Sequence, residues 1–207
     1  YYYTTLIMKI LVTGGCGFVG SSIALHLKNN LKNSKVYSLD NLSRNGSKIN
    51  LNRLKNNKIK NYNVDIANYN KLLKLPKFDF IIDCCAEAAI EDSIKKPFKV
   101  FNTNLIGSFN ILNKCVKDNT KIIFLSSSRV YSINSLKKNI KILKDKRKKL
   151  ISKKIDEKFD TDGPKSLYGF TKLASEDLIK EFSYSNNIKY IINRFGVISG
   201  PWQFGYQ

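Results

Sequence analysis

Two side chains with acid–base potential lie four residues apart in this sequence. Tyr168 and Lys172 open and close the segment Tyr-Gly-Phe-Thr-Lys. We expect this segment at the start of a helix, so that both side chains project from one helix face. A phenol is normally a poor base near neutral pH, but a neighbouring ammonium stabilises the phenolate. The pair therefore indicates a tyrosine base with a lysine partner, although this spacing alone is common and discriminates little.

Three consecutive serines, Ser126 to Ser128, end an apolar run at residues 120–126 that is typical of a buried strand. The carboxyl ends of strands are where open α/β sheets build their sites. A hydroxyl at this edge can hold a substrate oxygen while Tyr168 removes its proton. The alternative is ordinary turn chemistry after a strand, for which serine is also favoured.

A glycine-rich segment, residues 13–20, lies between the first expected strand and the first expected helix. Gly14, Gly17 and Gly20 occupy every third position of it. Such glycines permit a tight turn, let the backbone approach a pyrophosphate, and let the helix pack closely against the strand. The helix N-terminus then offers unpaired N–H groups and a positive dipole end to the phosphates. With this strand and helix around it, the segment predicts a dinucleotide site.

An acidic residue follows the second expected strand, as a dinucleotide site requires. Asp40 comes directly after the run Val-Tyr-Ser-Leu, where its carboxylate would accept hydrogen bonds from the adenosine ribose and repel a 2′-phosphate. This favours NAD over NADP, although Arg44 lies close by, and a turn residue is the alternative role for Asp40. Asp65, after the third strand, is placed to contact adenine, with a helix N-cap as its alternative.

The elements that position these groups alternate between strand and helix. Alternation of this kind means a parallel sheet with helices on both faces. The predicted fold class is therefore α/β, a Rossmann-like doubly wound parallel sheet. Apolar runs and helical periodicity predict strands at residues 9–13, 35–39, 59–63, 77–85, 120–126 and 189–193, and helices at residues 21–29, 98–117 and 165–186.

The net charge of +20 raises the question of a nucleic-acid partner. Almost all of the basic residues are lysines spread over the whole chain, and asparagine is also abundant. Both have AT-rich codons, so genome composition accounts for the excess. The exception is residues 137–158, where basic residues far outnumber acidic ones. A solvated loop or surface helix is the default there, so we expect no nucleic-acid partner.

Other classes of site are disfavoured by the composition. The four cysteines and the single histidine, His26, show no metal-ligand spacing, so we expect no metal site and reduced, mostly buried thiols. No apolar run reaches the roughly 20 residues that span a bilayer, and residues 1–7 lack the basic start of a secretory signal. We therefore expect a cytoplasmic protein without a membrane partner.

Both ends of the chain depart from the pattern. Residues 1–7 precede Met8, which is followed directly by the first expected strand, so we interpret them as a disordered or non-native leader. Residues 200–207 are rich in aromatics and stop without a helix-ending signal. We therefore expect one NAD-binding domain over residues 8–207, with a basic insertion at about 133–162, and a C-terminal substrate domain that is largely absent.

Together these motifs resemble those of the extended short-chain dehydrogenases/reductases, the NAD-dependent epimerase/dehydratase group. The resemblance covers residues 8–207 and is carried by Thr-Gly-Gly-x-Gly-Phe-Val-Gly, the strand end Asp-Asn-Leu, Ser-Ser-x-x-Val-Tyr and Tyr-x-x-x-Lys. It implies NAD as the cofactor and a homodimer formed through the helices at 98–117 and 165–186. The implied cofactor contacts are Gly14, Gly17, Phe18, Val19, Gly20, Asp40, Asn41, Ser43, Arg44, Asp65, Ile66, Asn104 and Lys172.

A finer resemblance is to the CDP-paratose (CDP-tyvelose) 2-epimerases. It is carried by the segment that begins Leu-Ser-Arg, by the long insertion, and by Gly-Pro-Trp-Gln-Phe-Gly near the C-terminus. Position by position, it implies Ser127 as the catalytic hydroxyl, Tyr168 as the base, Lys172 as its partner, and residues 200–205 at the border of a sugar pocket. The implied contacts with a CDP-sugar substrate are Ser128, Arg129 and Gln203.

Two departures from the family pattern bear on the chemistry. The usual Val-Tyr-Gly reads Val-Tyr-Ser, and the acid pair by which 4,6-dehydratases eliminate water is replaced by Ser128 and Arg129, which disfavours dehydratase chemistry. The resemblance instead implies transient oxidation. Tyr168 would deprotonate a sugar hydroxyl while its carbon gives hydride to NAD, and hydride would return to the opposite face of the keto-sugar. In the paratose-type enzymes this inverts C2.

Two alternatives stay open. Another nucleotide-sugar 4-epimerase or reductase of the same family would share these motifs, because the part that grips the substrate is mostly absent. A non-catalytic NAD-binding sensor or scaffold would need the fold but not Ser127, Tyr168 and Lys172. We further expect the 207-residue chain to be inactive by itself.

Overall fold

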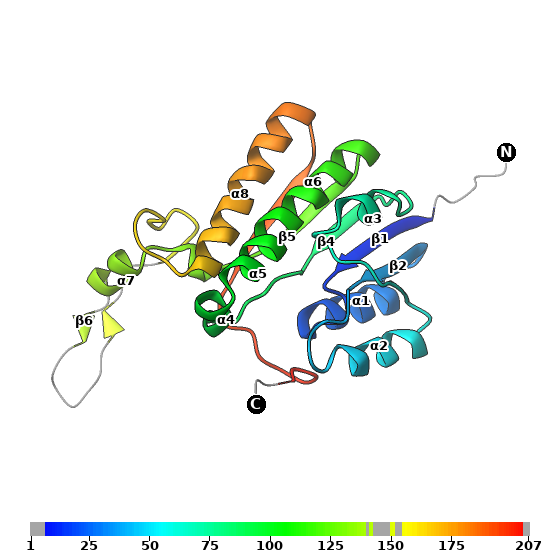
Figure 1. Ribbon diagram of the computed structural model, residues 1–207, viewed down its shortest axis with the longest axis horizontal. Helices are drawn as coiled ribbons and strands as arrows, with labels where there is room; N and C mark the ends of the chain where they lie inside the picture. The colour runs from blue at the N-terminus through cyan, green and yellow to red at the C-terminus, as the bar shows by residue number, and fades with distance from the viewer. Residues whose placement is uncertain (1–6, 140, 143–149, 152–154, 205–207) are drawn as a thin grey trace.

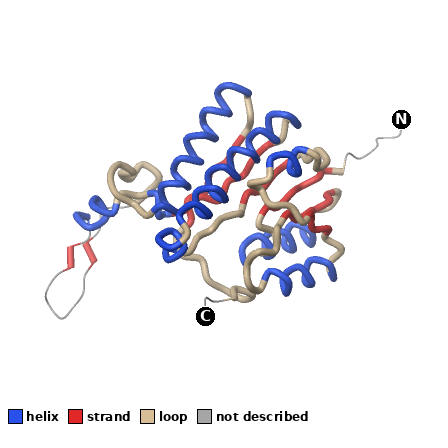
Figure 2. The backbone as a smooth tube through the Cα atoms, in the orientation of Figure 1, coloured by secondary structure: helices blue, strands red, loops and turns tan. Residues whose placement is uncertain are grey.

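The computed structural model describes residues 7–139, 141–142, 150–151 and 155–204. Six strands form one sheet in the order β3-β2-β1-β4-β5-β8, with every neighbouring pair parallel (Figures 1 and 2). Because the order reverses beside β1, the chain runs outward to β3 and then crosses to β4 on the other side of β1. This doubly wound order confirms the predicted fold class. The strands are β1 (Met8–Thr13), β2 (Ser34–Leu39), β3 (Lys60–Tyr62), β4 (Phe80–Asp83), β5 (Lys121–Ser127) and β8 (Tyr190–Phe195).

Helices cover both faces of this sheet (Figure 1). Successive side chains of a strand point to opposite faces, and β1 shows the result. Ile10 joins a buried cluster with Ala24 of the first helix, whereas Leu11 joins a second cluster with Ile111. The helices are α1 (Phe18–Asn30) and α2 (Ser47–Asn56) on one face, and α3 (Tyr69–Leu73), α6 (Gly107–Asp118) and α8 (Leu167–Asn186) on the other.

The helix predicted at residues 98–117 is built from three consecutive pieces. They are α5 (Pro97–Phe101), a π-helical turn η1 (Asn102–Ile106) and α6. In the π-helical turn the N–H of Gly107 donates to the carbonyl oxygen of Asn102, five residues earlier. Such turns are rare and occur frequently at functional sites. No feature of the apolar periodicity signals it.

The structure corrects other boundaries. The strand predicted at 77–85 is shorter, because the Asp83 carboxylate accepts the N–H of Cys85 at 3.2 Å and ends the strand with a local turn. Cys84 and Cys85 therefore follow β4 rather than belonging to it. The sequence pattern also misses the short helices α2, α3, α4 (Ile90–Lys95) and α7 (Ile133–Asn139).

The basic insertion leaves the sheet after β5 and returns to it before α8. It contains α7 and a small antiparallel pair, β6 (Lys141–Ile142) with β7 (Leu150–Ile151). Its returning limb is attached near the sheet, since the N–H of Ser132 donates to the carbonyl oxygen of Asp160 at 3.0 Å. Much of the basic segment predicted at 137–158, and residues 1–6 of the predicted leader, lie outside the described residues.

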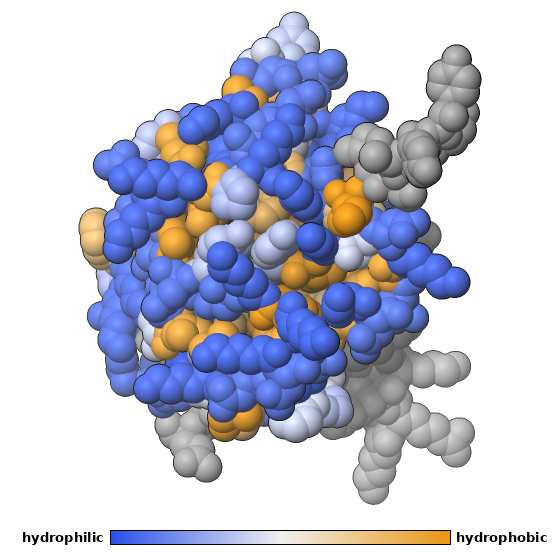
Figure 3. All heavy atoms as spheres, turned by 90° about the vertical axis from the view of Figure 1, so that its right-hand side faces the viewer, coloured by the Kyte–Doolittle hydropathy of each residue, from blue (hydrophilic) through white to orange (hydrophobic). Residues whose placement is uncertain are grey.

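The surface on the right-hand side of Figure 1 is mostly hydrophilic, with apolar side chains in small separate groups (Figure 3). Within the described ranges, no helix combines the length and apolarity that crossing a membrane requires.

Candidate active site

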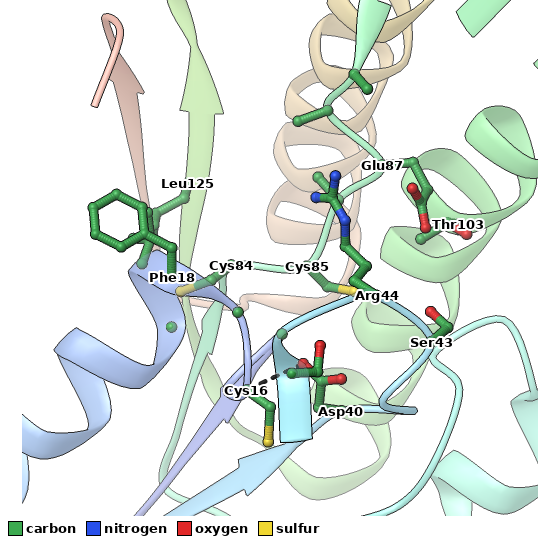
Figure 4. Close-up of a pocket in the computed structure, with 18 of the residues that line it drawn as sticks. Cys16, Phe18, Asp40, Ser43, Arg44, Cys84, Cys85, Glu87, Thr103 and Leu125 are labelled. Atoms are coloured by element: carbon green, nitrogen blue, oxygen red, sulfur yellow. Dashed lines mark hydrogen bonds between the residues drawn. The ribbon is translucent and has the colours of Figure 1, made fainter. Parts of the chain in front are cut away.

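A cavity of about 910 Å³ lies along the carboxyl ends of the central strands, where the strand order reverses. Crevices at such reversal points are where doubly wound sheets bind ligands. Its walls come from the glycine loop after β1, the segments after β2 and β4, the first turns of α8 and the segment after β8. Figure 4 shows part of this cavity, with Asp40 joined to the backbone of Cys16 and with Glu87 beside Thr103.

The glycine loop is shaped by two close backbone approaches. Gly14 has a φ of +60°, and a Cβ there would lie 3.0 Å from the carbonyl oxygen of Cys84. A Cβ on Gly20 would lie 2.2 Å from the carbonyl oxygen of Gly14, so α1 can begin this close to the loop only with glycine. Gly17 precedes α1 without a capping side chain, which leaves the first N–H groups of the helix for an anion. The cavity is lined by all the predicted loop contacts, Gly14, Gly17, Phe18, Val19 and Gly20.

Asp40 lies beside this loop, held by two backbone N–H groups. Its Oδ2 accepts from Cys16 at 3.0 Å and its Oδ1 from Leu42 at 2.8 Å. Burial raises the pKa of Asp40, and these two hydrogen bonds and the charge of Arg44 act in the opposite direction. The carboxylate keeps further lone pairs at the cavity wall, where ribose hydroxyls can donate to them.

Asn41 and Asp65 join the segments after β2 and β3. The Asn41 side-chain amide donates to Asp65 at 2.8 Å, and the other oxygen of Asp65 accepts the N–H of Ala67 at 2.8 Å. The helix N-cap alternative for Asp65 is wrong, because Asn68 caps α3 by accepting the N–H of Lys71. The same end of the cavity is lined by Asn41, Ser43, Arg44, Asp65 and Ile66.

Ser127, Tyr168 and Lys172 all line the cavity. Ser127 ends β5 and is 9% exposed, and its Oγ accepts the N–H of Arg129 at 3.1 Å. Lys172 is 2% exposed. Its Nζ donates to the carbonyl oxygen of Leu125 at 2.9 Å and lies 4.4 Å from the centroid of the Phe124 ring. The structure thus places the Ser127 hydroxyl on the same cavity wall as Tyr168 and Lys172, although Ser127 is distant from both in the sequence.

The start of α8 is pressed against the 3-10 turn η2 (Ser128–Val130) that follows β5. A Cβ on Gly169 would lie 2.1 Å from the carbonyl oxygen of Arg129, so the helix approaches this closely only because residue 169 is glycine. Ser166 caps the helix by accepting the N–H of Gly169 at 3.1 Å. The approach sets Tyr168 beside the end of β5.

Three predicted contacts are not on the cavity wall. Asn104 is 1% exposed and faces inward from the π-helical turn. Its side chain bonds both backbone groups of Glu87, at 2.8 and 3.1 Å, and donates to Thr171 at 3.2 Å. Asn104 therefore fixes the segment after β4 to α8 from behind the wall. Ser128 and Arg129 lie on η2 beside the cavity, whereas Gln203 lines it.

A charged pair on the wall escapes the sequence analysis. Glu87 is 5% exposed, and its carboxylate lies 2.8 Å from the ammonium of Lys99 on α5. Both residues line the cavity. The signal that could have found Glu87 is its place just after a buried strand, the same logic that selects Asp40 and Ser127.

The segment after β8 closes one side of the cavity. Trp202, Gln203 and Phe204 line it. The Arg53 guanidinium lies 4.1 Å from the centroid of the Trp202 ring, and a Cβ on Gly46 would lie 2.4 Å from the Phe204 ring. The segment that begins Leu-Ser-Arg and the Gly-Pro-Trp-Gln-Phe-Gly segment, which both carry the finer resemblance, therefore contact each other.

The cysteines are free, as predicted. Cys16 and Cys115 are buried, and burial raises the pKa of each thiol to about 12. Cys84 and Cys85 line the cavity and are half-buried, and burial raises the pKa of both. The thiols are therefore protonated and poorly nucleophilic at neutral pH. Within the described part of the chain, no three His, Cys, Asp or Glu side chains gather as a metal site.

Comparison with known proteins identifies the family of this chain. A family model described as the NAD dependent epimerase/dehydratase family matches residues 10–206. The chain is 30% identical to the dTDP-D-glucose 4,6-dehydratase of Dictyostelium discoideum over 203 residues, which are 96% of this chain and 45% of that protein. It is 27% identical to UDP-glucuronate 4-epimerase 4 of Arabidopsis thaliana over 205 residues, 94% of this chain and 43% of that protein. The chain thus spans about half the length of these relatives.

Solved structures of similar shape are also nucleotide-sugar enzymes. The UDP-glucose 4-epimerase of Thermotoga maritima, solved with UDP-glucose, has a TM-score of 0.79 and 29% identity, covering 97% of this chain and 59% of that one. The UDP-glucuronic acid 4-epimerase of Bacillus cereus, solved with UDP-glucuronic acid and NAD, has a TM-score of 0.77 and 27% identity, covering 95% and 59%.

Proposed function

Because this chain belongs to the NAD-dependent epimerase/dehydratase family, we propose that the full-length protein is a nucleotide-sugar epimerase that oxidises a sugar hydroxyl transiently. One observation carries the proposal. Ser127, Tyr168 and Lys172 line the same cavity as the glycine loop and Asp40. A protein that only bound the dinucleotide would need the loop and Asp40 but not the other three.

The residues present fit NAD, the cofactor of the family. The glycines let the loop and α1 pack closely, since a Cβ on Gly14 or Gly20 would meet backbone, and the start of α1 offers its N–H groups to a pyrophosphate. Asp40 accepts hydrogen bonds from the adenosine ribose, and its negative charge disfavours a 2′-phosphate. When bound, NAD supplies the acceptor and donor of the hydride.

The chain's own residues move the proton and hold the sugar. Tyr168 takes the proton of the sugar hydroxyl and later returns it. Ser127 donates a hydrogen bond to the same oxygen, which develops negative charge as the proton leaves. Lys172, one helical turn after Tyr168 on α8, lines the same cavity wall. The positions of the dehydratase acid pair hold Ser128 and Arg129, which cannot perform the acid–base steps of water elimination, so epimerisation is favoured.

For the substrate we favour CDP-paratose, with inversion at C2. The support is the resemblance of the Leu-Ser-Arg and Gly-Pro-Trp-Gln-Phe-Gly segments to the paratose-type enzymes, together with the packing of Phe204 on Gly46. A UDP-sugar 4-epimerase is the second candidate, favoured by the names of the similar proteins. A panel of CDP-paratose, UDP-glucose and UDP-glucuronate offered to the full-length protein separates them. Conversion of a UDP-sugar alone would overturn the CDP assignment.

Replacement of Tyr168 by phenylalanine separates an enzyme from a NAD-binding sensor. We expect Tyr168→Phe to lower kcat by about 100- to 10,000-fold, the usual contribution of a general base, and to leave NAD affinity unchanged. Tyr69→Phe is the matched control, because Tyr69 lies on α3 at 43% exposure. Full turnover by Tyr168→Phe would contradict the proposed catalytic role.

The proposal includes a homodimer formed through α5, α6 and α8, which lie side by side in Figure 1. Large apolar side chains are exposed on these helices, with Phe98 at 79%, Phe109 at 41% and Tyr184 at 90%. Exposed aromatic side chains on neighbouring helices support a contact surface along them. We expect a dimer by mass measurement at micromolar concentration, and a monomer for Phe98→Asp but not for Tyr69→Asp. A wild-type monomer would contradict this. A cytoplasmic location, consistent with free thiols, completes the proposal.

A further inference from the structure

A buried ion pair lies directly behind the catalytic side chains. Glu176 follows Tyr168 and Lys172 at the same four-residue interval on α8, so the three share a helix face. The side chain of Glu176 is 2% exposed and that of Arg194 on β8 is 13% exposed. Arg194 binds both carboxylate oxygens, with Nε at 3.0 Å from Oε1 and Nη2 at 2.7 Å from Oε2. Such a bidentate pair has a fixed geometry.

The same carboxylate holds the end of β5. The Ser126 hydroxyl donates to Oε1 of Glu176, and Ser126 is the register partner of Arg194 in the sheet. One residue earlier, the carbonyl oxygen of Leu125 accepts from Lys172. Two consecutive residues of β5 are thus tied to α8, immediately before Ser127. These bonds hold the end of β5 against α8, and so fix the separation between the Ser127 hydroxyl and Tyr168.

Arg194 also contacts the basic insertion. Its Nη1 donates to the carbonyl oxygen of Glu157 at 3.0 Å. Its guanidinium lies 5.2 Å from the centroid of the Tyr131 ring, which packs edge-on against Phe159 at 5.6 Å between centroids. The carboxylate of Glu176 raises the pKa of Arg194, so the guanidinium is charged at every working pH. The returning limb is therefore bonded, at Glu157, to the same arginine that pairs with Glu176 on α8.

We infer that Glu176 and Arg194 are positioning residues for the epimerase reaction, and that Arg194 links the returning limb of the insertion, residues 155–160, to the catalytic strand end. The inference rests on the proposed function for its catalytic consequence, and on the contacts alone for the linkage. It gives the insertion a role, as a support for the geometry of Ser127 and Tyr168, that its lysine content does not suggest.

The catalytic consequence is tested in full-length protein with the sugar that the substrate panel selects. Ser126→Ala removes one bond to Glu176 without changing charge, and Glu176→Gln removes the charge and keeps the shape. We expect kcat to fall by about 10- to 100-fold in both, as small misplacements do, with KM and NAD affinity within about twofold. Arg194→Lys, which keeps the charge, should retain more activity than Arg194→Gln.

The matched control is Asp177→Asn, which alters the next residue of α8 and breaks an exposed pair with Lys180. We expect no change in kcat. Wild-type kcat in a folded Ser126→Ala and a folded Glu176→Gln would overturn the positioning role. The positioning role would also be overturned if both variants lost NAD affinity and melting temperature along with kcat, because that pattern would show a purely structural pair.

The linkage is tested without any substrate, by amide hydrogen exchange. We expect Glu176→Gln to speed exchange at residues 125–131 and at residues 155–160, and Asp177→Asn to change neither. Unchanged exchange at 155–160 would overturn the linkage. If the wild-type protein converts no nucleotide sugar, the proposed function fails, while the exchange result still decides whether Arg194 joins the insertion to the strand end.

Discussion

The two ends of the cavity are built by different means. The nucleotide end is built mainly by backbone groups. Gly14 and Gly20 pack against carbonyl oxygens, and two backbone N–H groups hold Asp40. The catalytic end is made by side chains from β5, α8 and β8, held by the Glu176–Arg194 pair and by Asn104. Backbone shape governs the first end, and long-range polar contacts govern the second.

This difference predicts that substitutions at the two ends affect different properties of the protein. Changes at the nucleotide end should act on NAD affinity, because that end presents fixed N–H groups and one carboxylate. Changes at the catalytic end should act on kcat or on stability, because its side chains are buried and hydrogen-bonded to each other. The sharpest tests take one residue from each end with a matched control.

Gly20→Ala should have the largest effect at the nucleotide end. The added Cβ would meet the carbonyl oxygen of Gly14 at 2.2 Å, where backbone has to shift. We expect NAD affinity to fall by about 100-fold, equivalent to about 3 kcal/mol, and the free energy of unfolding to fall by about 1–3 kcal/mol. Titration with NAD and chemical denaturation measure the two.

Gly196→Ala controls for the stability effect of adding a methyl group, since a Cβ there would meet nothing within 4 Å. It should unfold like the wild type. Normal NAD binding by Gly20→Ala would show that the loop does not hold the pyrophosphate. It would also contradict the account in which backbone shape governs the nucleotide end.

Asn104→Ala should have the next largest effect, and on stability. It leaves the buried N–H and carbonyl groups of Glu87 without the amide that bonds both. Unsatisfied buried groups of this kind cost about 2–4 kcal/mol together, which denaturant unfolding should show. Asn113→Ala on α6, whose amide bonds only the Phe109 carbonyl at an exposed position, should cost under about 0.5 kcal/mol. A similar loss in the two variants would contradict the role of Asn104.

Asp40→Asn should have the smallest effect and should separate binding from stability. We expect NAD affinity to fall by about tenfold, or about 1.4 kcal/mol, because a charged acceptor for the ribose is lost. Burial raises the pKa of Asp40 in the folded protein, so the folded state holds a proton more tightly than the unfolded chain. Ionisation of Asp40 therefore costs stability as pH rises above the ordinary aspartate range.

The wild-type free energy of unfolding should accordingly lose a contribution as pH rises through that range, and Asp40→Asn should lack this loss. Denaturant unfolding at a series of pH values checks it. A variant that binds NAD normally, or that becomes less stable relative to wild type as pH rises, would contradict the account of Asp40.

The same comparison explains what the sequence could predict. The glycine loop and Asp40 lie in one short strand–loop–helix–strand unit, and Tyr168 and Lys172 lie on one helix, so local patterns are enough to find them. The resemblance names Asn104 as a cofactor contact, but its bonds to Glu87 and Thr171, like the Glu176–Arg194 pair, join residues far apart in the chain. Arg194 and Ser126 are brought together only by strand register. The π-helical turn that carries Asn104 has no signature in apolar periodicity.

The most direct test of the proposed function follows the sugar C2 proton by NMR while the full-length protein acts on CDP-paratose in D2O. In the proposed mechanism Tyr168 moves the hydroxyl proton and NAD carries the hydride, so the C2 hydrogen would not exchange with solvent. We predict conversion to the 2-epimer without deuterium at C2. Deuterium at C2 would contradict hydride transfer, and a protein that binds NAD but epimerises none of the nucleotide sugars in the panel would contradict the function itself.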